Sequence, residues 1–300
     1  METLNHCPSC YSPGPFDEEF RVRDHYGSGE FFGIQRCSCC GLLFTNPRPQ
    51  PSEMGVYYKS GMYISHTDKA KGFTGRLYHW VKQEMLRSKL RMLKNHTVGE
   101  GLRLLDYGCG TGSFALAAKN AGFAVFGYEP DPAAAELGRK KGIDVFEREG
   151  EAIGAKARFD VISLWHVLEH LHRFPGIIDD FREALSDRGL LLIALPMADS
   201  ADARHYREYW AAWDVPRHLV HFTPATIENK LSDHGFRLEK RYPLVFDSFY
   251  VSLLSEKYQG RSLPHLRAFF LGFWSNYRAK TGKSSWSSEV FVFRKKESSR

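Results

Sequence analysis

The 300-residue sequence lacks the features that would place it outside ordinary globular proteins. No apolar run approaches the ~18 residues that a membrane-spanning helix requires. The stretch from Met1 to Cys7 shows neither the basic nor the apolar part of a secretory signal. Internal repeats and low-complexity segments are absent as well. We therefore expect a globular protein of the cytoplasm, where thiols stay reduced, with no transmembrane segment.

Acidic residues are scarce at the C-terminal end only. Residues 241–300 hold 11 Lys/Arg against 4 Asp/Glu, whereas residues 101–240 hold 17 against 21. The net charge of +6 therefore does not reflect a uniformly basic surface. A basic end is typical of a solvated rim, and it also fits contact with phosphate or with an anionic lipid surface.

Cysteine is nearly absent after residue 41, because five of the six cysteines precede it. Two Cys-x-x-Cys pairs, Cys7/Cys10 and Cys37/Cys40, offer four thiolates for a structural Zn²⁺, with Cys39 as a spare thiol. Metal binding would supply folding energy to a short segment with little apolar content. We expect a zinc ribbon over residues 1–45. A reduced, metal-free remnant is the alternative, and a redox pair is disfavoured because no βαβ pattern surrounds either motif.

The pattern of apolar residues along the rest of the chain changes near residue 100. Three prolines in residues 46–53 indicate a linker, and helical spacing from Gly75 to Asn95 indicates an amphipathic helix, so residues 46–100 form a linker and helical cap. Residues 101–300 then alternate apolar strands with helices, which predicts an α/β fold with a parallel sheet covered on both faces. The expected strands are 102–107, 124–128, 159–164 and 190–195, and the expected helices are 113–121, 132–141, 175–185 and 223–234.

A glycine-rich loop follows the first of these strands. Gly108, Gly110 and Gly112 allow a tight turn and close approach of a ligand. Dinucleotide-binding folds use a similar loop. Here, however, Asp106 precedes the glycines and would repel phosphate but pair with an ammonium group. Glu129 ends the next strand, where an acid accepts hydrogen bonds from ribose hydroxyls. An amino acid plus a ribose without pyrophosphate describes S-adenosylmethionine (SAM).

These residues carry a family resemblance. Asp106-x-Gly108-x-Gly110-x-Gly112 and Glu129 resemble the first motif and the ribose-binding acid of class I SAM-dependent methyltransferases. The resemblance covers about residues 75–300 and implies a Rossmann-like sheet of seven strands, with the cofactor at the carboxyl ends of the first two strands. It makes these five residues cofactor contacts, together with Cys109 inside the loop, whose alternative role is that of a small residue that fits.

The sequence after the fourth strand argues against the amino groups of nucleic-acid bases as substrates. Enzymes that methylate base amines usually carry Asn/Asp-Pro-Pro-aromatic there, whereas this chain has Leu164-Trp-His-Val. It resembles small-molecule methyltransferases with a His-Val-Leu-Glu-His sequence. We expect His166 and His170 on one face of a short helix. His166 is a candidate cofactor or substrate contact and base, and His170 and Glu169 are candidate packing and capping groups. No third ligand is evident for a metal site on these two histidines.

A second cluster lies in the insertion after the fifth strand. Trp210-x-x-x-Asp214-x-Pro-Arg217-His218-Leu resembles the signature of a group of bacterial methyltransferases with poorly defined substrates. The resemblance places this loop at the substrate pocket. We expect Asp214 to orient His218, His218 to act as base, and Arg217 to hold a substrate anion. The alternative is that Asp214 and Arg217 form a buried pair that fixes the loop.

The remaining segments are assigned more coarsely. Residues 247–258 are expected to be strand six leading into a helix, and 285–294 the antiparallel last strand. The aromatic stretch 263–276 either packs in the core or caps the pocket, where its aromatic face would admit a lipid-like substrate. The segment Tyr57–His66 and the helix after it are candidates to close over the cofactor.

The leading hypothesis is a methyltransferase that transfers a methyl group from SAM to oxygen or carbon of a small molecule. His218, His166 and Asp214 are its catalytic candidates, and nucleic acid is not an expected partner. The first alternative is RNA or protein methylation, with the ribbon and the basic end gripping the polymer. The second is a catalytically inactive SAM-binding interaction module, against which the intact glycine loop and Glu129 argue. Nothing in the sequence indicates the oligomeric state.

Overall fold

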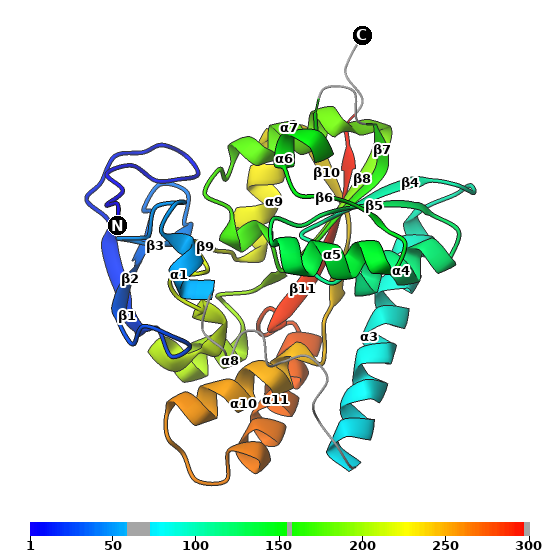
Figure 1. Ribbon diagram of the computed structural model, residues 1–300. Helices are drawn as coiled ribbons and strands as arrows, with labels where there is room; N and C mark the ends of the chain where they lie inside the picture. The colour runs from blue at the N-terminus through cyan, green and yellow to red at the C-terminus, as the bar shows by residue number, and fades with distance from the viewer. Residues whose placement is uncertain (59–72, 155–157, 297–300) are drawn as a thin grey trace.

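The computed structural model describes residues 1–58, 73–154 and 158–296. Its centre is a seven-stranded sheet in the order β10-β11-β8-β7-β4-β5-β6, in which β11 runs antiparallel to the other six strands (Figure 1). This confirms the expected Rossmann-like sheet. The strands span β4 Arg103–Tyr107, β5 Ala124–Tyr128, β6 Asp144–Phe146, β7 Phe159–Trp165, β8 Leu185–Pro196, β10 Phe236–Pro243 and β11 Ser288–Lys295.

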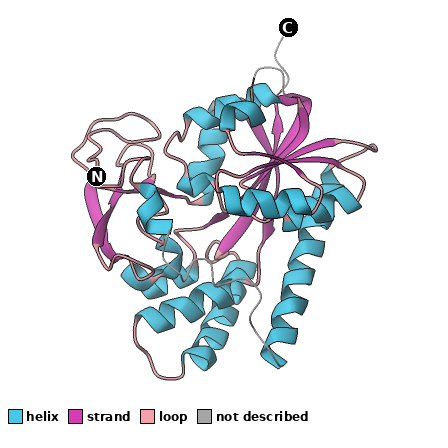
Figure 2. Ribbon diagram, viewed as in Figure 1, coloured by secondary structure: helices cyan, strands magenta, loops and turns pink. Residues whose placement is uncertain are grey.

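Helices cover both faces of this sheet, because its central strands are apolar on both sides (Figure 2). Leu104 of β4 packs with α4 and α5, whereas the next residue, Leu105, packs with α7 and α9 on the opposite face. The helices are α1 Met54–Tyr58, α3 Phe73–His96, α4 Ser113–Asn120, α5 Pro132–Lys140, α6 Glu149–Ala152, α7 Gly176–Ala184, α8 Ala201–Tyr206, α9 Pro224–Asp233, α10 Asp247–Tyr258 and α11 Pro264–Lys280.

Local sequence explains where several helices begin. The Asp131 carboxylate accepts a hydrogen bond from the Ala134 amide at the start of α5, with Pro132 at the first helical position. Thr223 and Thr226 form a reciprocal capping box before α9. The predicted helices in these two places are therefore confirmed to within a residue or two. The predicted helix from Gly75 to Asn95 is confirmed as α3.

The N-terminal segment forms a second, smaller sheet in the order β1-β2-β3-β9, with β1 Asp17–Arg23, β2 Phe31–Arg36, β3 Leu43–Thr45 and β9 Val220–His221. The fourth strand comes from the insertion after β8. Trp210 and Trp213 of that insertion are almost completely buried against Phe32 and Ile34 of the small sheet. The insertion aromatics, expected to line a substrate pocket, therefore join the N-terminal segment to the larger domain.

One assignment near the C-terminus was wrong. Residues 247–258 form helix α10 without a strand, because Ser248, Ser252 and Ser255 fall at helical spacing and give it a small, buried face. The sixth strand is instead β10, whose sequence Phe-Arg-Leu-Glu-Lys-Arg-Tyr-Pro is too charged to signal a strand.

The aromatic stretch 263–276 also differs from the core-packing expectation. It lies in α11, where most of its large side chains face solvent, including Phe269, Phe270 and Phe273. In the part of the chain that the structure describes, no helix has both the length and the apolar character to cross a bilayer.

Candidate functional site

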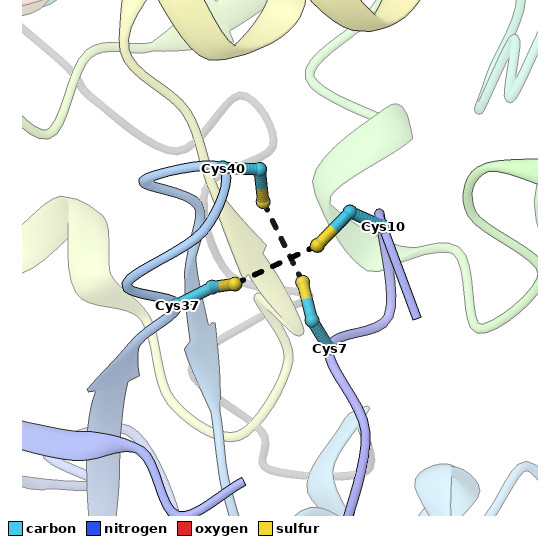
Figure 3. A group of neighbouring side chains, drawn as sticks. All are labelled: Cys7, Cys10, Cys37 and Cys40. Atoms are coloured by element: carbon cyan, nitrogen blue, oxygen red, sulfur yellow. Dashed lines mark hydrogen bonds between the residues drawn. The ribbon is translucent and has the colours of Figure 1, made fainter. Parts of the chain in front are cut away.

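The two Cys-x-x-Cys motifs meet as the spacing predicts (Figure 3). Each motif lies on the same kind of turn. In the first, the Cys7 amide donates to the Ser12 carbonyl and the Tyr11 amide donates to the Cys7 carbonyl. In the second, the Cys37 amide donates to the Leu42 carbonyl and the Gly41 amide donates to the Cys37 carbonyl. The residue four positions after each first cysteine, Tyr11 or Gly41, has a positive φ. Two equivalent knuckles thus aim their sulfurs at one point.

The four sulfurs fit a tetrahedral metal. The Cys7–Cys40 and Cys10–Cys37 Sγ–Sγ distances are both 3.6 Å, close to the ~3.8 Å edge of a tetrahedron with Zn–S bonds of ~2.3 Å. All four thiols are free of disulfides, and Cys39 is exposed outside the group. Bound there, Zn²⁺ would cross-link the two knuckles and stabilise the N-terminal segment.

The glycine loop has the geometry of a ligand cradle. Gly108, Gly110 and Gly112 all adopt positive φ. A Cβ on Gly108 would lie 2.5 Å from Val167 Cγ2, whereas a Cβ on Gly110 would meet no protein atom within 4 Å. Gly108 is thus required by packing, and Gly110 borders the open space above the loop.

Glu129 closes the loop from the end of β5. Its carboxylate accepts hydrogen bonds from the Gly110 amide at 2.9 Å and from the Asp131 amide at 3.0 Å. Partial burial raises the pKa of Glu129, and these two bonds oppose the rise. Cys109 lies behind the loop, where its Sγ packs against Gly127. Burial raises the pKa of Cys109 to about 12, which makes this thiol a packing group rather than a nucleophile.

Asp106 is 2% exposed at the end of β4 and accepts a hydrogen bond from the Ser163 hydroxyl at 2.8 Å. Burial raises its pKa to about 6, although Ser163 and Lys89 favour the ionised form. Lys89 of α3 holds its ammonium group 4.1 Å above the Trp165 ring. Its pKa is lowered by burial, against the attraction of Asp106 and Asp247. An ammonium group is therefore already attracted to Asp106 in this site.

His166 follows β7, the strand paired with β4, and has a φ of 59°. It lies outside the 3₁₀ turn Leu168–His170, so His166 and His170 do not share a helix face as expected. Its Nε2 is 3.2 Å from Asp247 Oδ2 and its Nδ1 is 3.4 Å from Glu169 Oε1. Burial disfavours the charged ring, but the two carboxylates outweigh it and raise the pKa of His166 to about 9. The two carboxylates therefore favour the imidazolium form of this ring.

His218 and His170 lie on the other side of Glu169, with their rings 4.6 Å apart in an edge-to-face contact. His218 Nδ1 is 2.9 Å from the Ala212 carbonyl, and His170 Nδ1 is 3.0 Å from the Arg217 carbonyl. A carbonyl only accepts, so each Nδ1 carries a hydrogen, and in the neutral form of either ring the lone pair is on Nε2. Burial and the neighbouring His218 lower the pKa of His170 to about 4.

Glu169 is the centre of this cluster and is 1% exposed. Its Oε1 lies 4.0 Å from His218 Nε2, and neither carboxylate oxygen has a well-aligned hydrogen bond from any residue that the structure describes. Burial opposes its ionisation, but His166, His218 and His170 hold its pKa below the ordinary value. One ligand atom each from Glu169, His170 and His218 lie within 4.8 Å of one another, a donor set that a divalent cation also tolerates.

Asp214 and Arg217 form a buried pair, as the alternative interpretation held. Arg217 is 1% exposed, and its guanidinium lies 2.7 Å from Asp214 Oδ1 and 3.0 Å from Asp24 Oδ1 of the N-terminal segment. Arg217 is therefore paired with two carboxylates and is not available to bind a substrate anion. Asp214 Oδ2 lies 3.9 Å from His218 Nε2, which is an electrostatic contact and not a hydrogen bond.

The structure thus brings the predicted residues into two neighbouring groups. Asp106, the glycine loop and Glu129 form one, and His166 and His218 are joined by Glu169 in the other, with Asp214 at its edge. Sequence analysis missed Lys89 and Asp247 as site residues, since one lies on the amphipathic helix and the other in a segment taken for a strand. Of the proposed closing segment, residues 59–66 lie outside the described residues, whereas the Tyr58 hydroxyl contacts His170 Nδ1 at 3.0 Å.

Comparison with known proteins identifies the family of this chain. The profile of the methyltransferase-domain family matches residues 77–241. A ubiquinone biosynthesis O-methyltransferase of Rhodopseudomonas palustris (strain BisB5) is 28% identical over 181 residues, covering 56% of this chain and 71% of the relative. One from Azorhizobium caulinodans is 28% identical over 162 residues, covering 49% and 64%.

A solved structure shows the same fold. Magnesium protoporphyrin IX methyltransferase of Synechocystis PCC 6803, with bound S-adenosylhomocysteine (SAH), matches with a TM-score of 0.53 at 14% identity, covering 80% of this chain and 96% of that chain. The chain belongs to the methyltransferase-domain family, since the family profile spans more than half of it. It is a class I SAM-dependent methyltransferase.

Proposed function

We propose that this protein transfers the methyl group of SAM to a hydroxyl oxygen of a small molecule, with His218 as the general base. The observation that carries the proposal is the fixed tautomer of His218, whose Nε2 lone pair faces the buried Glu169. The relatives named above as O-methyltransferases support oxygen as the acceptor.

Methyl transfer needs an in-line nucleophile held close to the sulfonium methyl and freed of its proton. A hydroxyl proton taken by His218 Nε2 would create an imidazolium 4.0 Å from the Glu169 carboxylate. The negative charge of Glu169 stabilises that imidazolium, as a carboxylate does for a catalytic histidine elsewhere. In this proposal the His166 ring, whose charged form Asp247 and Glu169 favour, polarises the acceptor oxygen and does not act as base.

The cofactor side of the proposal uses the first group of residues. Asp106 would pair with the SAM ammonium group, the glycine-loop backbone would approach the cofactor, and Glu129 would accept the ribose hydroxyls. SAM supplies the electrophilic methyl, and these residues orient it. We also propose that Cys7, Cys10, Cys37 and Cys40 bind one structural Zn²⁺.

The proposal is tested by incubating the purified protein with radiolabelled SAM and a host extract, followed by fractionation into small molecules, RNA and protein. Label in the small-molecule fraction that mass spectrometry assigns to a methyl ether supports the proposal. Label in RNA or protein would instead establish the polymer-methylating alternative. No transfer to any fraction, with SAM bound, would leave the inactive binding module.

The role of His218 needs a matched variant. His218→Asn is expected to lower kcat by ~10²-fold or more while SAH affinity stays unchanged and the thermal midpoint falls no further than in the control variant below. An acceptor with a more acidic hydroxyl should recover most of the lost rate, because it needs no base. His221→Gln changes another buried histidine, one that bonds Thr45, and is the control. Equal losses in the two variants would contradict the assignment of His218 as base.

A further inference from the structure

Helix α11 has its small residues inside and its large residues outside. The residues that face the rest of the protein are Ala268, Gly272, Ser275 and Ala279, all of them buried. The exposed face carries Leu266, Phe269, Phe270, Phe273, Trp274 and Tyr277, which are between 38% and 63% exposed. These six lie at spacings of three, four and one along the helix and therefore share one broad face.

Folding explains the small residues but not the large ones. The helices α10 and α11 lie side by side at the base of the molecule (Figure 1). A Cβ on Gly272 would lie 2.7 Å from Phe249 Cδ1 of α10, so small side chains are needed for the two helices to approach. Of the exposed rings, Phe269 also contacts Phe249 of α10, with the ring centroids 5.9 Å apart, but packing against α10 does not explain Phe270 or Phe273. A contiguous exposed apolar surface of this kind marks an interaction site.

The charged residues of α11 and of the segments next to it in the sequence are of one sign. Residues 257–283 contain six Lys/Arg and no Asp or Glu. Arg267 is bonded to Glu256 at 2.7 Å and Arg278 lies 5.6 Å from the Trp274 ring, while Lys280 and Lys283 are exposed. A second copy of the chain would bring together two faces that are both bordered by positive charge, which disfavours self-association through this face.

An apolar, aromatic helix face bordered by Lys and Arg matches the headgroup region of a bilayer with negatively charged lipids. Aromatic rings lie at the level of the headgroups, and basic residues contact the anionic phosphates. A 17-residue helix is about 25 Å long, enough to lie flat on a membrane without crossing it. We infer that the exposed face of α11 binds the protein peripherally to an anionic lipid surface.

This inference is tested by sedimentation of the full-length protein with vesicles. Binding is expected with phosphatidylcholine vesicles containing 30% phosphatidylglycerol, at least about tenfold stronger than with phosphatidylcholine alone, and weakened at 0.5 M salt. The double variant Phe270→Ser/Phe273→Ser should lose at least about tenfold in vesicle affinity, because both rings leave water on binding. Its thermal midpoint and SAH affinity should not change, since neither ring is buried in the protein.

Two controls separate the other occupants of this face. Phe31→Ser removes an equally exposed phenylalanine (62%) from β2 and should bind vesicles like the wild type. Sedimentation equilibrium without lipid reports self-association. The inference is overturned if the wild type does not bind the anionic vesicles, or if the double variant binds as well as the wild type. A wild-type dimer that the double variant abolishes would also overturn it and would assign the face to a second copy.

Discussion

Replacing Asp106 with asparagine tests whether the cofactor site holds a carboxylate at the expense of stability. Burial raises the Asp106 pKa from 3.8 to about 6, which corresponds to about 3 kcal/mol against the ionised form. The folded state therefore binds this proton more tightly than the unfolded state does. The stabilising contribution of the protonated Asp106 carboxyl is complete below pH ~3.8 and is lost as the pH rises through ~6. Asparagine keeps an acceptor for the Ser163 hydroxyl but has no charge to bury.

The expected result is that the difference in unfolding free energy between the variant and the wild type changes with pH. Between pH 4.5 and 7.5 the free energy of unfolding of Asp106→Asn, minus that of the wild type, should rise by about 2 kcal/mol in favour of the variant. Any constant cost of fitting the amide cancels from this comparison. Urea denaturation at the two pH values measures it, and Asp144→Asn at an exposed position controls for the loss of one carboxylate.

The same variant should lose SAH affinity, because the partner proposed for the ammonium group is gone. If the variant becomes more stable relative to the wild type as the pH rises, and also binds SAH more weakly, then Asp106 is retained for binding. A difference in unfolding free energy that stays constant within about 0.5 kcal/mol between the two pH values would refute the reasoning.

Three further sets of substitutions test other parts of the structure. Gly108→Ala should lower the free energy of unfolding, measured by urea denaturation, by ~2 kcal/mol or more. Gly110→Ala should cost less stability and should act chiefly on SAH affinity. Equal effects of the two variants on stability and on SAH affinity would contradict the distinction between the two glycines. Cys37→Ser should reduce bound zinc well below one ion per chain by elemental analysis and lower the thermal midpoint, whereas Cys39→Ser should retain the metal; zinc-free wild-type protein would exclude the metal site. Asp24→Asn should destabilise by ~3 kcal/mol because it leaves the buried arginine between the domains with one carboxylate; a loss below ~1 kcal/mol would show that the pair is not needed.

The sequence predicted the central sheet well, because the signals there are local. Buried parallel strands such as Leu190–Leu195 read as unbroken apolar runs, and Asp131-Pro132 marks a helix start. It failed at β10, an edge strand rich in charge, and at α10, whose packing face is made of serine. In both cases the tertiary partner decides the structure, and the residues alone carry the opposite pattern.

The site divides in the same way. The glycine loop, Glu129 and the four cysteines could be located because spacing along the chain nearly determines their geometry. The role of Arg217 could not, since its second carboxylate, Asp24, lies 193 residues away in the sequence. The link between His166 and His218 through Glu169 likewise depends on where two loops meet. Such contacts arise only when the insertion after β8 packs against the turn after β7.

The most direct test of the account is a calorimetric titration of SAH into the wild type, Glu129→Ala and Glu136→Ala. The account predicts one site per chain in the wild type and the same affinity in Glu136→Ala, where an exposed acid of α5 is removed. Glu129→Ala should bind at least about tenfold more weakly, since a charged acceptor for the ribose hydroxyls contributes about 1.5–3 kcal/mol. Equal affinity in all three proteins, or no binding by the wild type, would contradict the placement of the cofactor at the ends of β4 and β5.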